Sequence, residues 1–147
     1  RRIIDSRGNP TVEADIKTSN GFGRAAAPAG ASTGTHEVVA WPDGKVSKGM
    51  KFAEENVIPK LLGLSIDNQK EFDGLLKEID GTGNFSVIGG NISIAFSLAY
   101  AKAAADSKGI SLFEHINKKK SLWTIWLDIT IKIFGKNTNG FPVLNVI

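Results

Sequence analysis

The stretch TVEADIKTSNGFGRAAA, residues 11–27, decides how the first part of this chain folds. Val12, Ala14 and Ile16 alternate with charged residues, which is typical of a β-strand with one buried face. Asn20-Gly21 is the strongest short signal for a β-hairpin, so the rest of the stretch should return as an antiparallel strand. Gly23 and the three alanines give that returning strand little side-chain volume. We therefore expect something bulky to pack closely against it.

The residues before this hairpin predict one more strand. Ile3-Ile4 is a short apolar pair, and the following Asp5-Ser6-Arg7-Gly8-Asn9-Pro10 is dense in turn-forming residues. This order, in which a turn joins the first two strands and a hairpin joins the second to the third, predicts a three-stranded antiparallel meander.

From residue 45 onward the apolar residues follow the helical period instead. Residues 45–63 carry one apolar face interrupted by Pro59, which should kink or split the helix. Asn68 with Glu71, and later Ser111 with Glu114, have the spacing of helix N-terminal caps. Residues 92–105 are small and apolar almost all round, which is typical of a central, buried helix. Strands followed by helices predict an α+β fold, a sheet with a helical bundle on one face.

Composition excludes several classes of function. The chain has 147 residues, a net charge of +3 and no cysteine, with 41% hydrophobic and 22% charged residues. The lysines form no stripe interleaved with aromatic residues, so we expect no nucleic-acid binding. Without cysteine there is no disulfide, thiolate nucleophile or cysteine-based zinc site, which fits a reducing compartment.

Between the predicted strands and helices lies PAGASTGTHE, residues 28–37. Gly30 and Gly34 tolerate backbone angles that other residues avoid, and Ser32 and Thr33 place hydroxyls beside an unobstructed backbone. Such a segment is typical of a flexible turn, and it also suits a lid that closes over a ligand. Composition alone leaves both interpretations open.

Residues 118–140 are harder to interpret. Alternating isoleucines favour a strand, whereas Trp123 and Trp126 suit a helical face equally well. The apolar part is too short and too charged to span a bilayer. The triple lysine at 118–120 would suit a membrane-surface anchor over residues 118–134, but we favour a strand or packed extension and predict no membrane binding.

Several motifs together resemble the N-terminal domain of enolases. The longest are DSRGNPTVE at 5–13 and PAGASTG at 28–34; shorter matches run through the helices, and FPVLNVI at 141–147 resembles the first strand of the family's barrel domain. The resemblance implies a capping domain over 1–117, a divergent connector over 118–140 and the start of the barrel at 141–147. Both ends interrupt recognisable patterns, so we expect a piece of a longer protein.

The resemblance also implies a function. Enolases dehydrate 2-phosphoglycerate to phosphoenolpyruvate in glycolysis, with Mg²⁺, as cytoplasmic homodimers. By resemblance, Ser32 binds one Mg²⁺, and Arg7 and Glu13 form salt bridges across the dimer interface. For Arg7 and Glu13, the alternative is an ion pair within the sheet. The resemblance also implies that the substrate lid is formed by Gly30, Ala31, Ser32, Thr33 and Gly34.

Two stretches depart from the family's usual pattern: Val38-Val39-Ala40-Trp41-Pro42 after the lid, and Gly89-Gly90-Asn91 before the long helix. No catalytic residue is assigned within the chain. The family's general base, acid and carboxylate metal ligands are expected beyond Ile147, so the isolated chain should be inactive. A stand-alone, non-catalytic interaction module is the alternative.

Overall fold

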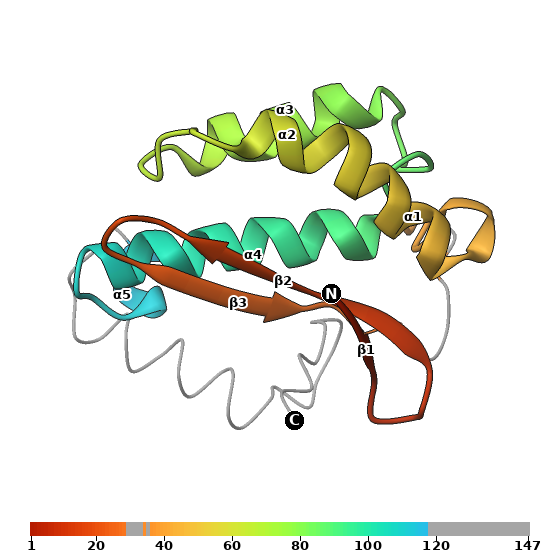
Figure 1. Ribbon diagram of the computed structural model, residues 1–147, viewed down its shortest axis with the longest axis horizontal. Coiled ribbons are helices and arrows are strands. Elements are labelled where there is room, and N and C mark those ends of the chain that lie inside the picture. Colours follow the sequence, from red (N-terminus) through yellow and green to blue (C-terminus); the bar gives the residue numbers. More distant parts are fainter. Residues whose placement is uncertain (29–33, 35, 118–147) are drawn as a thin grey trace. The chain divides into compact units, whose positions relative to one another are not determined.

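The computed structural model describes residues 1–28, 34 and 36–117. Strands β1 (Arg2–Ile4), β2 (Pro10–Lys17) and β3 (Phe22–Ala26) form an antiparallel sheet in the order β1-β2-β3 (Figure 1). The predicted meander is therefore confirmed, as is the α+β fold class, because every described helix follows the sheet in the chain.

Local hydrogen bonds explain the turn between β1 and β2. The Asp5 carboxylate accepts the backbone N–H groups of Asn9 and Arg7 at 2.8 and 2.9 Å, and Gly8 has φ +80°. These bonds, above all the one from Asn9, hold the pKa of Asp5 below its usual value. The Asp, Gly and Asn of the turn thus have the roles that their residue types predict.

The helical part begins after the loop that follows β3. The interruption at Pro59 was predicted: Pro59 has no N–H to continue the α-helical ladder, and the turn before it is a π-helix in which the Ile58 N–H bonds the Ala53 carbonyl. Gly63, with φ +84°, follows the end of this segment. The helical elements are η1 (Pro42–Gly44), α1 (Val46–Phe52), η2 (Ala53–Val57), α2 (Ile58–Leu61), α3 (Gln69–Asp80), α4 (Gly90–Ser107) and α5 (Leu112–Ile116).

Both predicted N-terminal caps are present. At the start of α3, the Asn68 side chain accepts the Glu71 N–H at 3.2 Å and donates to the Glu71 carboxylate at 3.0 Å. At the start of α5, Ser111 and Glu114 make the corresponding reciprocal bonds at 3.2 and 2.9 Å. Each cap satisfies amide groups that the first helical turn leaves without a partner.

Tyr100 of α4 ties the start of α3 to the core. Its ring stacks on Phe72 with the centroids 4.2 Å apart. Its hydroxyl donates to the Ser65 carbonyl at 2.7 Å and accepts the Asn68 N–H at 3.1 Å. Burial of the ring raises the pKa of this hydroxyl.

Helix α4 lies between the sheet and α3 (Figure 1), which confirms its predicted central position. Ala99, Ala103 and Ala104 are fully buried, but Ile94 and Leu98 are 50% and 39% exposed, so one stripe of the helix faces outward.

Small residues let α4 approach the sheet very closely. A Cβ atom added to Gly23 would lie 1.9 Å from the Ala99 carbonyl oxygen and 2.4 Å from the Ala103 nitrogen. The prediction that something bulky packs closely against the thin strand β3 is confirmed, and the element that does so is helix α4. The backbone of α4 itself packs there, because glycine and alanine on both elements leave no side chains between them.

The outer edge of β3 is capped by α4. The Asp106 carboxylate accepts the Phe22 N–H at 2.8 Å, and Lys102 Nζ donates to the Arg24 carbonyl at 2.9 Å. Edge strands with unpaired backbone groups are templates for aggregation. These two side chains, one helical turn apart, remove part of that template.

The remaining predictions on fold fall outside the described residues. They concern the connector at 118–140 and the start of a barrel at 141–147. In the part of the chain that the structure describes, no helix is long and apolar enough to cross a membrane.

Candidate functional site

The predicted lid segment is residues 30–34, and only Gly34 lies within the described residues. Its carbonyl accepts the Glu37 N–H at 3.2 Å. Gly30, Ala31, Ser32 and Thr33 fall outside. The site is therefore built here from the residues on either side of the segment.

On the N-terminal side the chain is fixed by β2. The Thr11 hydroxyl donates to the Ala27 carbonyl at 2.6 Å, and the Ala27 N–H bonds the Val12 carbonyl at 3.4 Å. Thr11 is 1% exposed and Ala27 is 6% exposed. A buried hydroxyl with its bond formed holds this carbonyl in one place, one residue before Pro28.

On the C-terminal side, residues 38–41, which we term the C-terminal arm, are held by the start of α4. The Val39 N–H donates to the Asn84 carbonyl at 2.8 Å, and the Val39 carbonyl accepts the Gly90 N–H at 2.7 Å. The Ala40 carbonyl accepts the Asn91 N–H at 3.3 Å. Backbone carbonyls of the arm thus cap the first turn of α4, which explains why the helix begins at Gly90 rather than at Ile92.

Gly89 and Gly90 are needed for this contact. A Cβ at Gly90 would lie 2.4 Å from Val38 Cγ2, and one at Gly89 would lie 2.8 Å from the Ala40 carbonyl oxygen. Gly89 also has φ +95°. The two stretches that depart from the family's usual pattern therefore pack against each other.

The loop between α3 and α4 is organised around one buried carboxylate. Asp80 is 4% exposed and accepts the N–H groups of Thr82, Val87 and Ile88 at 3.1, 3.1 and 2.7 Å. It also accepts the Thr82 hydroxyl, which itself accepts the Ser86 N–H at 3.1 Å. One carboxylate thus satisfies four donors along a nine-residue stretch of backbone, an arrangement that stabilises a buried charge.

The predicted interface residue Glu13 has its partners inside the sheet. It forms ion pairs with Arg1 and, at 3.6 Å, with Arg24. Arg24 also forms a bidentate pair with Asp15, its cross-strand neighbour, at 2.7 and 2.9 Å. This hydrogen bonding is the main reason that the pKa of Asp15 lies below its ordinary value.

Arg7 lies apart from this cluster, exposed in the turn between β1 and β2. Its side chain makes no hydrogen bond or ion pair with another residue in the described ranges. Within the chain, the structure brings Glu13 into the ion-pair arrangement that the sequence left open, and it does not bring Arg7 there.

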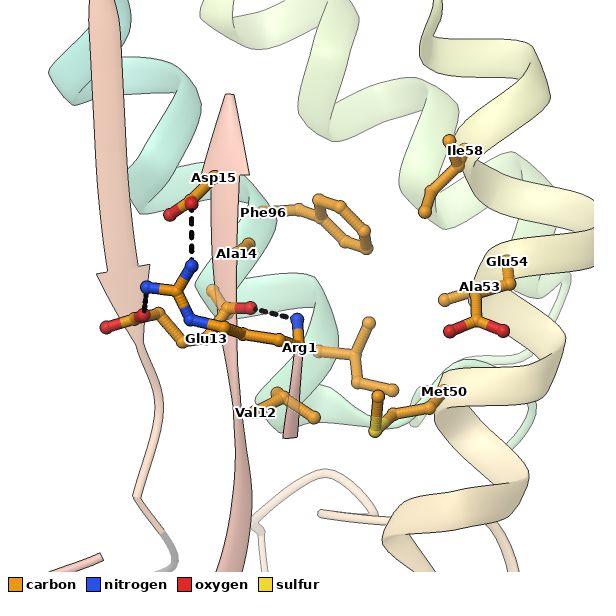
Figure 2. A pocket seen from close by; sticks show the side chains of 12 residues that line it. Arg1, Val12, Glu13, Ala14, Asp15, Met50, Ala53, Glu54, Ile58 and Phe96 are labelled. Carbon is orange, nitrogen blue, oxygen red and sulfur yellow. Dashed lines mark hydrogen bonds and ion pairs between the residues drawn. The ribbon is translucent and has the colours of Figure 1, made fainter. Parts of the chain in front are cut away.

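A cavity of about 280 Å³ opens beside this charge cluster. Figure 2 shows Ala14 and Val12 of β2 on one side and Met50, Glu54 and Ile58 of the helical segment on the other. Arg1 and its carboxylate partners lie at its rim. None of its described lining residues belongs to the C-terminal arm.

Comparisons with known proteins bear on the identity of this arrangement. A family model described as "Enolase, N-terminal domain" matches residues 1–116. The chain belongs to the enolase N-terminal domain family. An enolase from Methanosphaera stadtmanae is 54% identical over 116 residues, covering 79% of this chain and 28% of the relative. Enolases from Thermoplasma acidophilum and Pyrococcus furiosus are 49% and 50% identical over 121 and 123 residues, covering 82% and 79% of this chain.

The chain spans 28 to 30% of the length of these enolases. The enolase family model covers all of the described strands and helices. The expectation that the sheet and helices form an enolase N-terminal domain is confirmed. The roles of single residues in the lid segment and at the interface stay predictions.

No group of three or more histidine, aspartate or glutamate side chains comes together as a metal site in residues 1–28, 34 and 36–117. Ser32, the predicted Mg²⁺ ligand, is outside these residues. The assignment of Ser32 to Mg²⁺ rests on the resemblance to enolases and stays a prediction; a serine hydroxyl and backbone oxygen are hard donors suited to this ion.

Reasoning from the sequence missed the residues that fix the chain on either side of the predicted lid segment. Thr11 is a buried residue near the start of β2. Nothing in the local sequence distinguishes it from other threonines in strands. Asp80 did carry a signal, since Asp80-Gly81-Thr82 is typical of a side chain that bonds the backbone two residues on. Its reach to Val87 and Ile88 could not be read from that local pattern.

Proposed function

We propose that this chain is the N-terminal domain of an enolase that dehydrates 2-phosphoglycerate to phosphoenolpyruvate in glycolysis. The observation that carries this proposal is the match of residues 1–116 to the enolase N-terminal domain, with relatives about half identical in sequence. The identified relatives are enolases, and the family's reaction is transferred from them to the whole protein to which this domain belongs.

In this proposal the domain contributes the lid. Residues 30–34 close over the substrate, and Ser32 offers its hydroxyl and backbone oxygen to Mg²⁺. Enolase-superfamily sites are a known instance in which a Lys or His base works beside Mg²⁺, whose charge offsets the negative charge that builds on the substrate when its proton is removed. The small residues around Ser32 allow the backbone to approach the substrate and exclude water.

The fixed flanks of the segment support this role. Ala27 is held by Thr11, and Val39 is held by Asn84 and Gly90. A lid needs ends that stay in place, and hydrogen bonds to the sheet on one side and to the start of α4 on the other supply them.

Activity tests the proposal directly. The full-length enzyme should form phosphoenolpyruvate from 2-phosphoglycerate in a Mg²⁺-dependent manner, followed by absorbance at the enol double bond. The 147-residue chain alone should form none, because a single serine cannot both hold the metal and remove a proton. Product formed by the purified chain would contradict the second expectation, and an inactive full-length enzyme would contradict the first.

We further propose that the full-length enzyme is a cytoplasmic homodimer with Arg7 and Glu13 at its interface. The side chain of Arg7 is exposed and makes no ion pair inside the described part of the chain, so its charge is available to a partner subunit. Glu13, on the central strand β2, is held in a fixed position by its ion pairs with Arg1 and Arg24.

Truncation of Arg7 tests the interface. Arg7→Ala should raise the dimer dissociation constant of the full-length enzyme by about tenfold, roughly 1.4 kcal/mol, as for other interface arginines. Lys17→Ala is the matched control, since Lys17 is exposed on β2 and has no ion pair with another described residue. Sedimentation velocity across a dilution series measures both variants. Equal dissociation constants for Arg7→Ala and wild type would remove Arg7 from the interface.

A further inference from the structure

We propose that Asp80 is a positioning residue for the lid segment, acting through the loop 81–89 and the C-terminal arm; this inference rests on the proposed function. Asp80 belongs to α3, and its hydrogen bonds go to Thr82, Val87 and Ile88 rather than to the described residues of the C-terminal arm. Its influence passes through two consecutive sets of hydrogen bonds and one close-packed contact.

The first set fixes the shape of the loop. Asp80 binds the amides of Val87 and Ile88 at the far end of the loop and the amide of Thr82 at its start. Ile88 is completely buried, so its amide has no water to replace the carboxylate. The carboxylate is therefore the group that closes this loop on itself.

The second set joins the loop to the C-terminal arm. Asn84, in the middle of the loop, accepts the Val39 N–H at 2.8 Å, and Gly90, just after the loop, donates to the Val39 carbonyl at 2.7 Å. Val39 is thus held by both its backbone groups. Both partners sit on the backbone that Asp80 shapes.

The third feature is close packing, which makes the contact between the loop and the C-terminal arm rigid. Gly89 and Gly90 lie so close to Val38 and Ala40 that a Cβ on either glycine would clash at 2.8 Å or less. A close-packed contact of this kind passes a displacement on rather than absorbing it. When the loop loses the carboxylate, the arm should therefore lose its fixed position four residues after Gly34.

Hydrogen exchange in the 147-residue chain tests whether Asp80 fixes the loop and the C-terminal arm. This test does not depend on enzyme activity. In Asp80→Ala, the Val39 and Gly90 amides should exchange at least about tenfold faster than in the wild type, because the loop that holds them opens locally. Asp80→Asn, which keeps the volume and one acceptor, is the milder second variant should Asp80→Ala fold poorly. Glu78→Ala is the matched control: it removes an exposed carboxylate from the same helix.

Val57→Ala separates local opening from general loss of stability. Val57 is fully buried in η2, so its truncation should accelerate exchange throughout the β2–β3 ladder as well as in the arm. In the Asp80 variants the ladder should keep its protection while the arm loses it. Wild-type protection of Val39 and Gly90 in both Asp80 variants would overturn the inference, whatever the enzyme's activity.

Kinetics of the full-length enzyme test the functional half. Asp80→Asn should lower kcat about tenfold and raise the Mg²⁺ concentration for half-maximal rate, whereas Val57→Ala should leave both unchanged for the folded enzyme. A loosened arm with unchanged kcat and Mg²⁺ response would show that Asp80 holds the loop but does not position the lid, and would overturn the inference. Failure of the proposed function itself is distinguishable, since the wild-type enzyme would then form no phosphoenolpyruvate.

Discussion

Ser32→Ala in the full-length enzyme is expected to lower kcat by roughly 100-fold and to raise the Mg²⁺ concentration for half-maximal rate. The physical reason is that alanine has no hydroxyl to offer the ion, although its backbone oxygen remains. The loss should fall mainly on kcat rather than KM, because the metal's charge is needed most as negative charge develops during proton removal. Initial rates over a Mg²⁺ titration measure both effects.

Ser19→Ala is the control for this substitution. Ser19 is an exposed serine in the turn between β2 and β3, so removing its hydroxyl should leave kcat and the Mg²⁺ response unchanged. Thermal unfolding of both variants should match the wild type. Near-normal turnover of Ser32→Ala with an unchanged Mg²⁺ response would remove Ser32 from the metal site while leaving the family assignment intact.

Gly23→Ala is expected to destabilise the domain by about 3 kcal/mol, an effect at the upper end of overpacking in a core. The new methyl group would lie 1.9 Å from the Ala99 carbonyl oxygen and 2.4 Å from the Ala103 nitrogen. Both are backbone atoms inside α4, so no side-chain rotation relieves the clash. The helix must move away from β3 and, with it, the contacts that α4 makes across the sheet. Urea unfolding of the 147-residue chain measures the change.

Gly74→Ala is the matched control for the same chemical change. Gly74 lies in the middle of α3 with nothing within 4 Å of the Cβ position. Alanine there should stabilise the domain by roughly 0.5–1 kcal/mol, because it restricts the unfolded chain and favours the helix. The two substitutions should therefore have opposite signs. A Gly23→Ala variant as stable as the wild type would show that α4 does not approach the strand this closely.

The candidate site was only partly predictable from the sequence. The turn before β2 was predicted from its Asp, Gly and Asn, whereas the lid segment and its serine, predicted from motifs, lie mostly outside the described residues and stay predictions. The interface assignment was left between two alternatives, and the sequence could not choose the partner of Glu13. Its observed partners are Arg1, just before β1, and Arg24 of β3, and only the sheet brings them together.

What the sequence by itself determined about this protein is the set of elements whose cause is local. The alternation in β2, the Asn20-Gly21 turn and the caps at Asn68 and Ser111 all depend on residues within four positions of one another, so a linear pattern contains them. Only the tertiary structure decided that α4 packs its backbone on Gly23, that it begins at Gly90, and that Asp80 shapes the loop holding Val39. Each of these depends on atoms brought together by folding from distant parts of the chain, where close packing and the need to satisfy buried polar groups select one partner among many.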